Sequence, residues 1–175
     1  MSPTDGVSTK CAFCDWKRIK AEEPYRWLEG DENSDYYVVL ARNPKIMGHV
    51  LLISKEHYQD ITKLDMDNPS TVNILKALVK WTKRIRDELL SDDEHGKVYV
   101  MTMCEHWEPD EIKLGWKEGD EPVSTTEHLH FHLLPRYKDM RKKETAAENL
   151  FMRPEDERWF GDMFKTLKNR LADSE

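Results

Sequence analysis

The stretch H-L-H-F-H-L-L-P-R, residues 128–136, constrains the fold of this chain more than any other. Imidazoles alternate with apolar side chains over its first half, and a period of two is typical of a half-buried β-strand. Side chains two residues apart on a strand share one face. We therefore expect His128, His130 and His132 to form one row, with the residues between them facing a core: Leu129, Phe131 and Leu133.

Further elements are predicted on both sides of this strand. Three more β-branched or apolar runs predict strands at 36–42, 49–55 and 97–104. Asn68 is the expected N-cap of a long helix that has Pro69 in its first turn and continues to about Ser91. A closing amphipathic helix is expected after Pro154. Strands followed by a long helix and then further strands indicate an α+β fold around an antiparallel sheet.

Size and composition exclude several classes of protein. A chain of 175 residues fits one domain, and its net charge of -7 disfavours binding to a nucleic acid polymer, which needs a basic face. No stretch approaches the ~20 apolar residues of a membrane span, and the N-terminus has no apolar signal region. Three cysteines cannot all pair in disulfides, which suits a reducing compartment. We therefore expect a cytoplasmic protein without a membrane partner.

The three histidines in five residues suggest chemistry rather than a chance polar face, because histidine is the side chain poised for acid–base, nucleophilic and metal chemistry near neutral pH. One possibility is a zinc ion, held by His-x-His and a third ligand, that activates water. The other is an imidazole that acts as the nucleophile while its neighbours fix its tautomer and bind an anion. The spacing alone does not choose between them.

The pair Cys11 and Cys14, in C-A-F-C, is also open to two interpretations. Two thiolates at this spacing grip one zinc ion well, but a lone CxxC can also be a redox pair. A structural zinc needs two further ligands, for which the candidates are His49, His57 and one histidine of the row.

Together, C-A-F-C, G-H-V-L-L-I-S-K-E-H (48–57) and H-L-H-F-H-L-L-P-R resemble the histidine triad (HIT) superfamily, specifically its zinc-containing branch. The resemblance spans most of residues 11–137, in the order that the family has. It implies a HIT-like fold: an antiparallel sheet of about five strands, one long helix and a C-terminal helix. We expect a flexible tail at 1–10, a HIT domain at 11–140 and a C-terminal extension at 141–175, whose helix packs on the domain or on a dimer partner.

The resemblance also implies roles for the histidines. His130 would attack the α-phosphorus of a purine nucleotide and become a nucleotidyl-histidine, which water then hydrolyses. His132 and His49 would hold phosphate oxygens or support the row. A structural zinc ion would be held by four ligands: Cys11, Cys14, His57 and His128.

The same resemblance covers the class of reaction. Related uridylyltransferases carry glutamine at the third position of the triad, so His132 favours hydrolysis of a nucleoside phosphoramidate or dinucleoside polyphosphate. A nucleotidyltransferase and a nucleotide-sensing protein with little turnover are the alternatives. The family also implies a homodimer.

Three further positions can be compared with the family pattern, and one of them departs from it. Ser124 stands where glutamine is usual, Thr125 matches a hydroxyl expected to assist the leaving group, and Asn43 matches a ribose contact. Asn43 is equally explained as a turn residue before proline. Residues 105–126 form an acidic segment longer than the family's usual loop. An acidic rim would disfavour polyphosphates, so we expect a neutral or cationic leaving group such as an amine.

Overall fold

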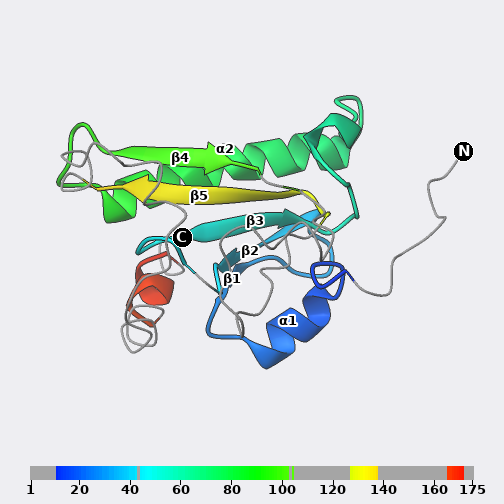
Figure 1. The fold of residues 1–175 in the computed structure, drawn as a ribbon, viewed down its shortest axis with the longest axis horizontal. Coiled ribbons are helices and arrows are strands. Elements are labelled where there is room, and N and C mark those ends of the chain that lie inside the picture. The colour runs from blue at the N-terminus through cyan, green and yellow to red at the C-terminus, as the bar shows by residue number, and fades with distance from the viewer. Residues whose placement is uncertain (1–10, 43, 103, 105–126, 138–164, 172–175) are drawn as a thin grey trace, which may run out of the picture.

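A five-stranded sheet forms the centre of the protein, in a computed structural model that describes residues 11–42, 44–102, 104, 127–137 and 165–171. The strands are β1 (Trp27–Glu29), β2 (Tyr36–Leu40), β3 (Val50–Ser54), β4 (Lys97–Met101) and β5 (His130–Arg136). They lie in the order β1-β2-β3-β5-β4, and each neighbouring pair is antiparallel (Figure 1). This confirms the expected α+β class and antiparallel sheet.

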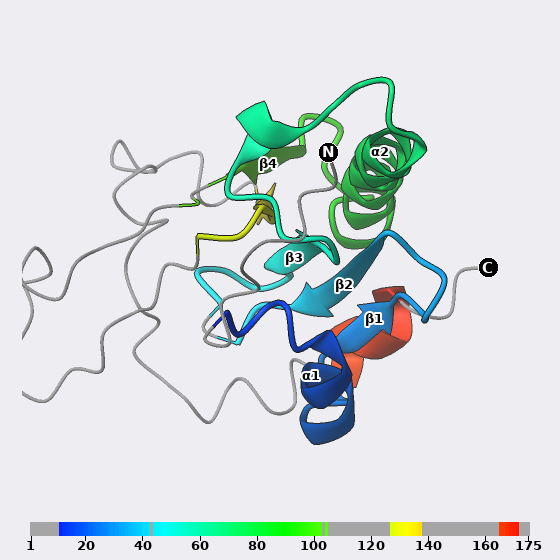
Figure 2. The same cartoon turned by 90° about the vertical axis from the view of Figure 1, so that its right-hand side faces the viewer.

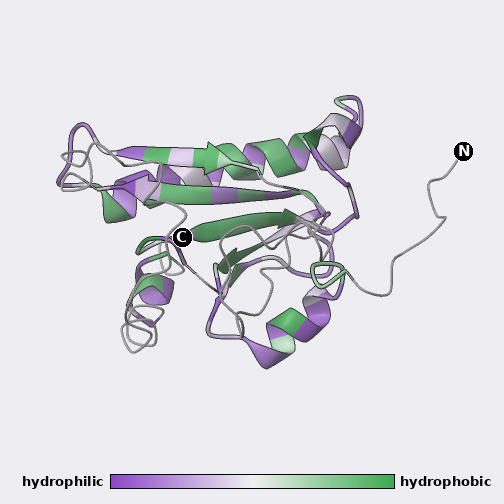
Figure 3. Cartoon of the chain, in the orientation of Figure 1, coloured by the Kyte–Doolittle hydropathy of each residue, from purple (hydrophilic) through white to green (hydrophobic). Residues whose placement is uncertain are grey.

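The long helix α2 (Pro69–Leu89) covers one face of the sheet. It begins as predicted, because the Asn68 side chain accepts a hydrogen bond from the Ser70 N–H at 2.9 Å. Its buried stripe packs against strand residues whose side chains point to the same face, and the hydrophobic central strands are visible in Figure 3. This core includes Ile74, Ala77, Trp81, Ile85, Leu52, Leu129, Phe131 and Leu133. The predicted inward direction of the residues between the histidines is thus confirmed.

A smaller apolar cluster lies on the opposite face. It contains Trp27, Tyr37, Val39, Leu51 and Ile53, against which the N-terminal segment packs. That segment includes the short helix α1 (Trp16–Glu22), and Figure 2 shows α1 and α2 on opposite sides of the sheet. The N-terminal segment therefore lies on the face to which the histidine row is expected to point.

Several boundaries differ from the sequence prediction. Strand β5 begins at His130 rather than at residue 128, since His128 lies in a bend before the strand. Neither α1, nor β1, nor the 3-10 turn η1 (Ile61–Lys63) was predicted. Part of the expected C-terminal helix is present at 165–171, where Leu167 and Leu171 are buried in the main core. The expected tail 1–10 and most of the extension 141–175 lie outside the described residues.

Among the described residues, no helix combines the length and the apolar character needed to cross a bilayer.

Candidate metal centre and histidine row

The CxxC loop is fixed to the sheet just before α1. The Cys14 N–H donates to the Cys11 carbonyl at 3.2 Å, which closes the loop as a turn. The hydroxyl of the buried Tyr37, on β2, donates to the Phe13 carbonyl at 2.9 Å. These two bonds close the loop and hold it against β2.

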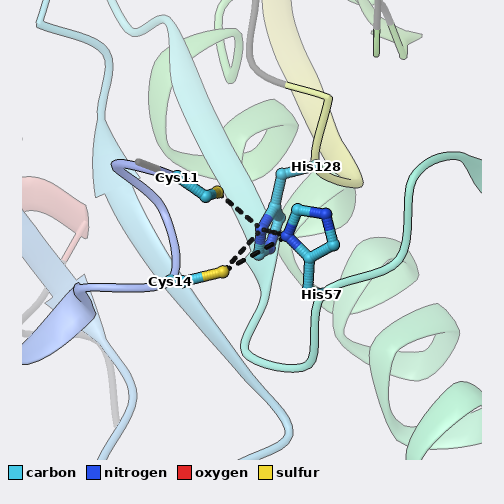
Figure 4. Close-up of side chains that lie close together, drawn as sticks. All are labelled: Cys11, Cys14, His57 and His128. Carbon is cyan, nitrogen blue, oxygen red and sulfur yellow. Dashed lines mark hydrogen bonds between the residues drawn. The ribbon is translucent and has the colours of Figure 1, made fainter. Parts of the chain in front are cut away.

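Four potential ligand atoms converge there. They come from Cys11, Cys14, His57 and His128, and all lie within 4.8 Å of one another (Figure 4). Cys14 Sγ is 3.2 Å from His57 Nδ1, Cys11 Sγ is 3.3 Å from His128 Nδ1, and the two Nδ1 atoms are 3.2 Å apart. The sequence placed these four residues in one ligand set through the family resemblance, and the structure brings all four together.

The backbone fixes the tautomer of His128. Its Nε2 lies 2.7 Å from the Ser54 carbonyl, which can only accept, so Nε2 carries the proton. Burial lowers the pKa of His128 to about 4, which keeps the ring neutral at pH 7. The lone pair of Nδ1 is therefore directed at the two thiols and at His57. A ring held by its second nitrogen in this way is the usual arrangement of a metal-binding histidine.

A bound cation would also change the ionisation of the Cys14 thiol. Burial, with a hydrogen bond to Cys11 and the charge of Cys11 adding to it, raises the pKa of the Cys14 thiol to about 12. The Cys14 thiol therefore stays protonated at neutral pH, whereas a bound metal ion deprotonates a coordinating thiol outright. The four residues can thus hold a metal ion whose charge the site itself lacks.

His130 is the next residue of the row and the first residue of β5. Its side chain is buried, and its Nδ1–H donates to the His128 carbonyl at 2.7 Å. Burial lowers its pKa, so the ring is neutral and Nε2 keeps a lone pair. A neutral imidazole whose other nitrogen donates to a carbonyl is the form in which histidine acts as a nucleophile.

A backbone amide sets the tautomers of the remaining two histidines. The Lys45 N–H donates to His49 Nδ1 at 3.1 Å, so the proton of neutral His49 is on Nε2. His49 Nε2 lies 2.9 Å from His132 Nδ1 and therefore donates to it. In neutral His132 the proton is then on Nε2, as a donor on the same face as His130.

Burial keeps this pair uncharged. The pKa of His49 is held well below its ordinary value by burial, with the charges of His132 and Lys45 adding to the effect. Burial lowers the pKa of His132 to about 3, and the neighbouring His130 and Lys45 act in the same direction. The ring centroids of His130 and His132 lie 4.9 Å apart, and within the described part of the chain neither Nε2 of this pair, one a lone pair and the other an N–H, has a hydrogen-bond partner.

Sequence reasoning missed the backbone groups that set these tautomers. The Ser54 carbonyl and the Lys45 N–H act without their side chains, and a backbone group leaves no signature in residue type. Phe13 was also missed, although it lies inside C-A-F-C; its ring centroid is 5.1 Å from that of His130. Three predicted site residues lie outside the described part of the chain: Asn43, Ser124 and Thr125.

Sequence comparisons with known proteins point to one family. The sequence profile of the HIT domain matches residues 31–139, which is more than half of the chain. An uncharacterised HIT-like protein from Borreliella burgdorferi is 30% identical over 133 residues, which cover 74% of this chain and 77% of that protein. A second uncharacterised HIT-like protein, from Methanocaldococcus jannaschii, is 26% identical over 127 residues, covering 73% and 79% of the two chains.

Solved structures share the fold. A HIT-like protein from Bartonella henselae superimposes with a TM-score of 0.54 and 20% identity, covering 89% of this chain and 91% of that one. A zinc-bound histidine triad family protein from Mycobacterium smegmatis gives a TM-score of 0.52 and 21% identity over 95% and 98% of the two chains. The profile match over residues 31–139 and the relative that is 30% identical show that the chain belongs to the histidine triad (HIT) family.

Proposed function

We propose that this protein is a nucleotide-binding hydrolase that cleaves at the α-phosphate of a nucleoside phosphoramidate or dinucleoside polyphosphate through a nucleotidyl-histidine intermediate. The observation that carries the proposal is the state of His130. It is neutral, its Nδ1–H is bonded to a main-chain carbonyl, and the lone pair of Nε2 is left for attack.

In the first step, His130 Nε2 forms a bond to the α-phosphorus while the bond to the leaving group breaks. The leaving group departs with the bonding electrons and takes up a proton from solvent, and the water that attacks in the second step returns a proton to solvent. The attacked ring retains its Nδ1–H, and the positive charge that it gains is stabilised by the His128 carbonyl at 2.7 Å. Water then supplies the oxygen that displaces His130, which restores the Nε2 lone pair and releases the nucleoside monophosphate.

His132 is the proposed donor to the phosphoryl oxygens. These oxygens gain negative charge as the nucleophile approaches, and a preorganised N–H at that place stabilises the charge. His49 holds the donor tautomer through its 2.9 Å bond to His132 Nδ1. Three further contacts remain predictions. They are those of Thr125 with the leaving group, Ser124 with the phosphate and Asn43 with the ribose.

The metal that we propose is a structural zinc ion. Tetrahedral coordination at roughly 2.3 Å to sulfur and 2.0–2.1 Å to nitrogen separates neighbouring ligand atoms by about 3.3–3.8 Å. The four residues already show sulfur–nitrogen separations of 3.2–3.5 Å and a nitrogen–nitrogen separation of 3.2 Å. When bound, zinc would supply the charge that keeps Cys11 and Cys14 as thiolates and would tie the N-terminal loop to β5. Four protein ligands leave no position for substrate, so the reaction steps above belong to the protein's own side chains.

For the assembly we propose a homodimer with a purine nucleotide bound to each chain. Strand β4 is the edge of the sheet next to β5, and its Tyr99 and Val100 are exposed. Exposed apolar side chains on an edge strand are suited to pairing with another chain. A reducing, cytoplasmic location remains the expectation from the cysteine content.

Steady-state turnover of matched adenylated substrates tests the function. We expect release of adenosine monophosphate, with phosphoramidates preferred over diadenosine polyphosphates, and loss of release in His130→Ala. A clear preference for polyphosphates would reject the proposed leaving group. Transfer to added phosphate in place of water would assign the chain as a nucleotidyltransferase, and tight binding without turnover would assign it as a nucleotide-sensing protein. Full hydrolysis by His130→Ala would refute the nucleophile.

A further inference from the structure

Phe13 links the metal-binding loop to the row of histidines. It lies between the two cysteines, so a metal ion bound to Cys11 and Cys14 would hold the backbone on both sides of Phe13. Its carbonyl accepts the Tyr37 hydroxyl at 2.9 Å, and its side chain packs against the apolar cluster on β2 and β3. The position of Phe13 is therefore fixed by the loop, by β2 and by the cluster below it.

The ring of Phe13 contacts the imidazole of His130. The ring centroids are 5.1 Å apart, and the planes meet at 64°, an edge-to-face arrangement. Phe13 also lies edge-on to His128, with centroids 5.8 Å apart and planes at 82°. One aromatic side chain thus touches both a potential metal ligand and the proposed nucleophile.

His130 is held from three directions. Its Nδ1–H is bonded to the His128 carbonyl, its ring lies against His132 at 4.9 Å between centroids, and Phe13 lies against it as described. The hydrogen bond fixes one nitrogen but still permits the ring to tilt about that bond. Contact with Phe13 limits the tilt, and a narrow range of approach is what an attacking atom requires.

We propose that Phe13 is a positioning residue for His130, through which an ordered CxxC loop sets the direction of Nε2. The inference rests on the proposed function, because it takes His130 to be the nucleophile. It assigns the metal-binding loop a part in catalysis that works by packing: the loop holds Phe13, and Phe13 holds the imidazole.

The test compares three variants of the zinc-loaded, full-length protein. Phe13→Leu keeps an apolar side chain and removes the aromatic edge, while Phe13→Tyr keeps the edge. Ala12→Ser changes the neighbouring exposed residue of the same loop and serves as the control. For each protein we would measure bound zinc, the single-turnover rate of nucleotidyl-His130 formation, KM, and the ¹⁵N signals of the His130 ring.

We expect Phe13→Leu to retain its zinc and its KM while the single-turnover rate falls about three- to tenfold, the range that an aromatic pair supports. Its His130 ring signals should shift or broaden, whereas those of Ala12→Ser and Phe13→Tyr should stay close to the original. An unchanged rate together with unchanged His130 signals would overturn the proposal. A loss confined to KM would also overturn it, because Phe13 would then contact the nucleotide instead.

The ring signals separate this inference from the proposed function. If the original protein forms no nucleotidyl-histidine, the proposed function fails, and the His130 signals of zinc-loaded Phe13→Leu still decide whether Phe13 orients the ring. Phe13→Met, with a flexible side chain of similar size, provides a second variant if Phe13→Leu loses zinc. If both Phe13→Leu and Phe13→Met lose zinc, the role of Phe13 is to stabilise the metal-binding loop, and the proposed positioning of His130 is overturned.

Discussion

His49 makes two hydrogen bonds of opposite kinds, and two substitutions can separate them. Its Nδ1 accepts from the Lys45 N–H at 3.1 Å, and its Nε2–H donates to His132 at 2.9 Å. The shorter side chain of asparagine can place an oxygen where Nδ1 lies, and the longer side chain of glutamine can place an N–H₂ where Nε2 lies. His49→Asn thus keeps the acceptor for Lys45, and His49→Gln keeps the donor to His132.

The two variants should lose different properties. His49→Gln leaves the Lys45 N–H without its acceptor, which costs about 1–3 kcal/mol for a buried group and toward the lower limit at a half-buried one. We expect its free energy of unfolding to fall by about 1 kcal/mol and its kcat/KM to stay within about threefold of the original. Urea unfolding and release of nucleoside monophosphate measure the two quantities.

His49→Asn should show the opposite pattern. In this variant no side chain at position 49 donates to His132 Nδ1. His132 is then no longer held in the tautomer that presents its Nε2–H to the phosphoryl group. One neutral hydrogen bond is worth about 1 kcal/mol, so kcat/KM should fall by about five- to tenfold while the free energy of unfolding changes less than in His49→Gln. Equal activity in the two variants would refute the assignment of tautomers along Lys45, His49 and His132.

Three further predictions concern stability and metal binding. Gly48 has φ +80°, and a Cβ there would overlap Leu89 and lie 3.0 Å from Pro135 Cγ, so Gly48→Ala should lower the free energy of unfolding by about 2–4 kcal/mol in a urea titration. The folded-state pKa of His132, at about 3, lies below the unfolded value near 6.5. The unfolded chain therefore binds more protons than the folded chain between these two values. The free energy of unfolding should fall from its value above pH 6.5 as the pH approaches 3, by up to about 1.4 kcal/mol per pH unit for each histidine with a lowered pKa. A free energy of unfolding that does not change with pH in this range would contradict the neutral row. Cys14→Ser should lose bound zinc in a metal analysis and, with it, about 4 kcal/mol of stability where free zinc exceeds its Kd a thousandfold, whereas Cys104→Ser, outside the cluster, should keep both.

Part of the fold follows directly from residue pattern. The alternation in 128–136 gave the correct faces for His130 and Phe131, and Asn68-Pro69 gave the correct start of α2, because both signals are local and strong. β1 was not predicted because three residues, Trp27–Glu29, are too few to show a period. Its place in the sheet depends on pairing with β2, which no local pattern reveals.

The candidate site was likewise predicted from the sequence only in part. The family resemblance brought His57, Cys11, Cys14 and His128 into one set although 117 positions separate Cys11 from His128, and the structure places them together. Strand geometry alone put His128 in a uniform row with His130. In the structure His128 lies in a bend before β5, its Nδ1 is within 3.5 Å of both cysteine sulfurs, and its carbonyl accepts the hydrogen bond of His130. These separate roles depend on contacts distant in sequence, so strand periodicity alone did not predict them.

The covalent state of His130 during turnover tests the central claim most directly. The protein would be mixed with an adenylated substrate, quenched under alkaline conditions that preserve a phosphorus–nitrogen bond, and studied by intact-protein and peptide mass spectrometry. We predict an adduct with the mass of one adenylyl group on His130, which forms and decays at the rate of turnover and is absent from His130→Gln. Turnover without any adduct, or an adduct on another residue, would contradict the account.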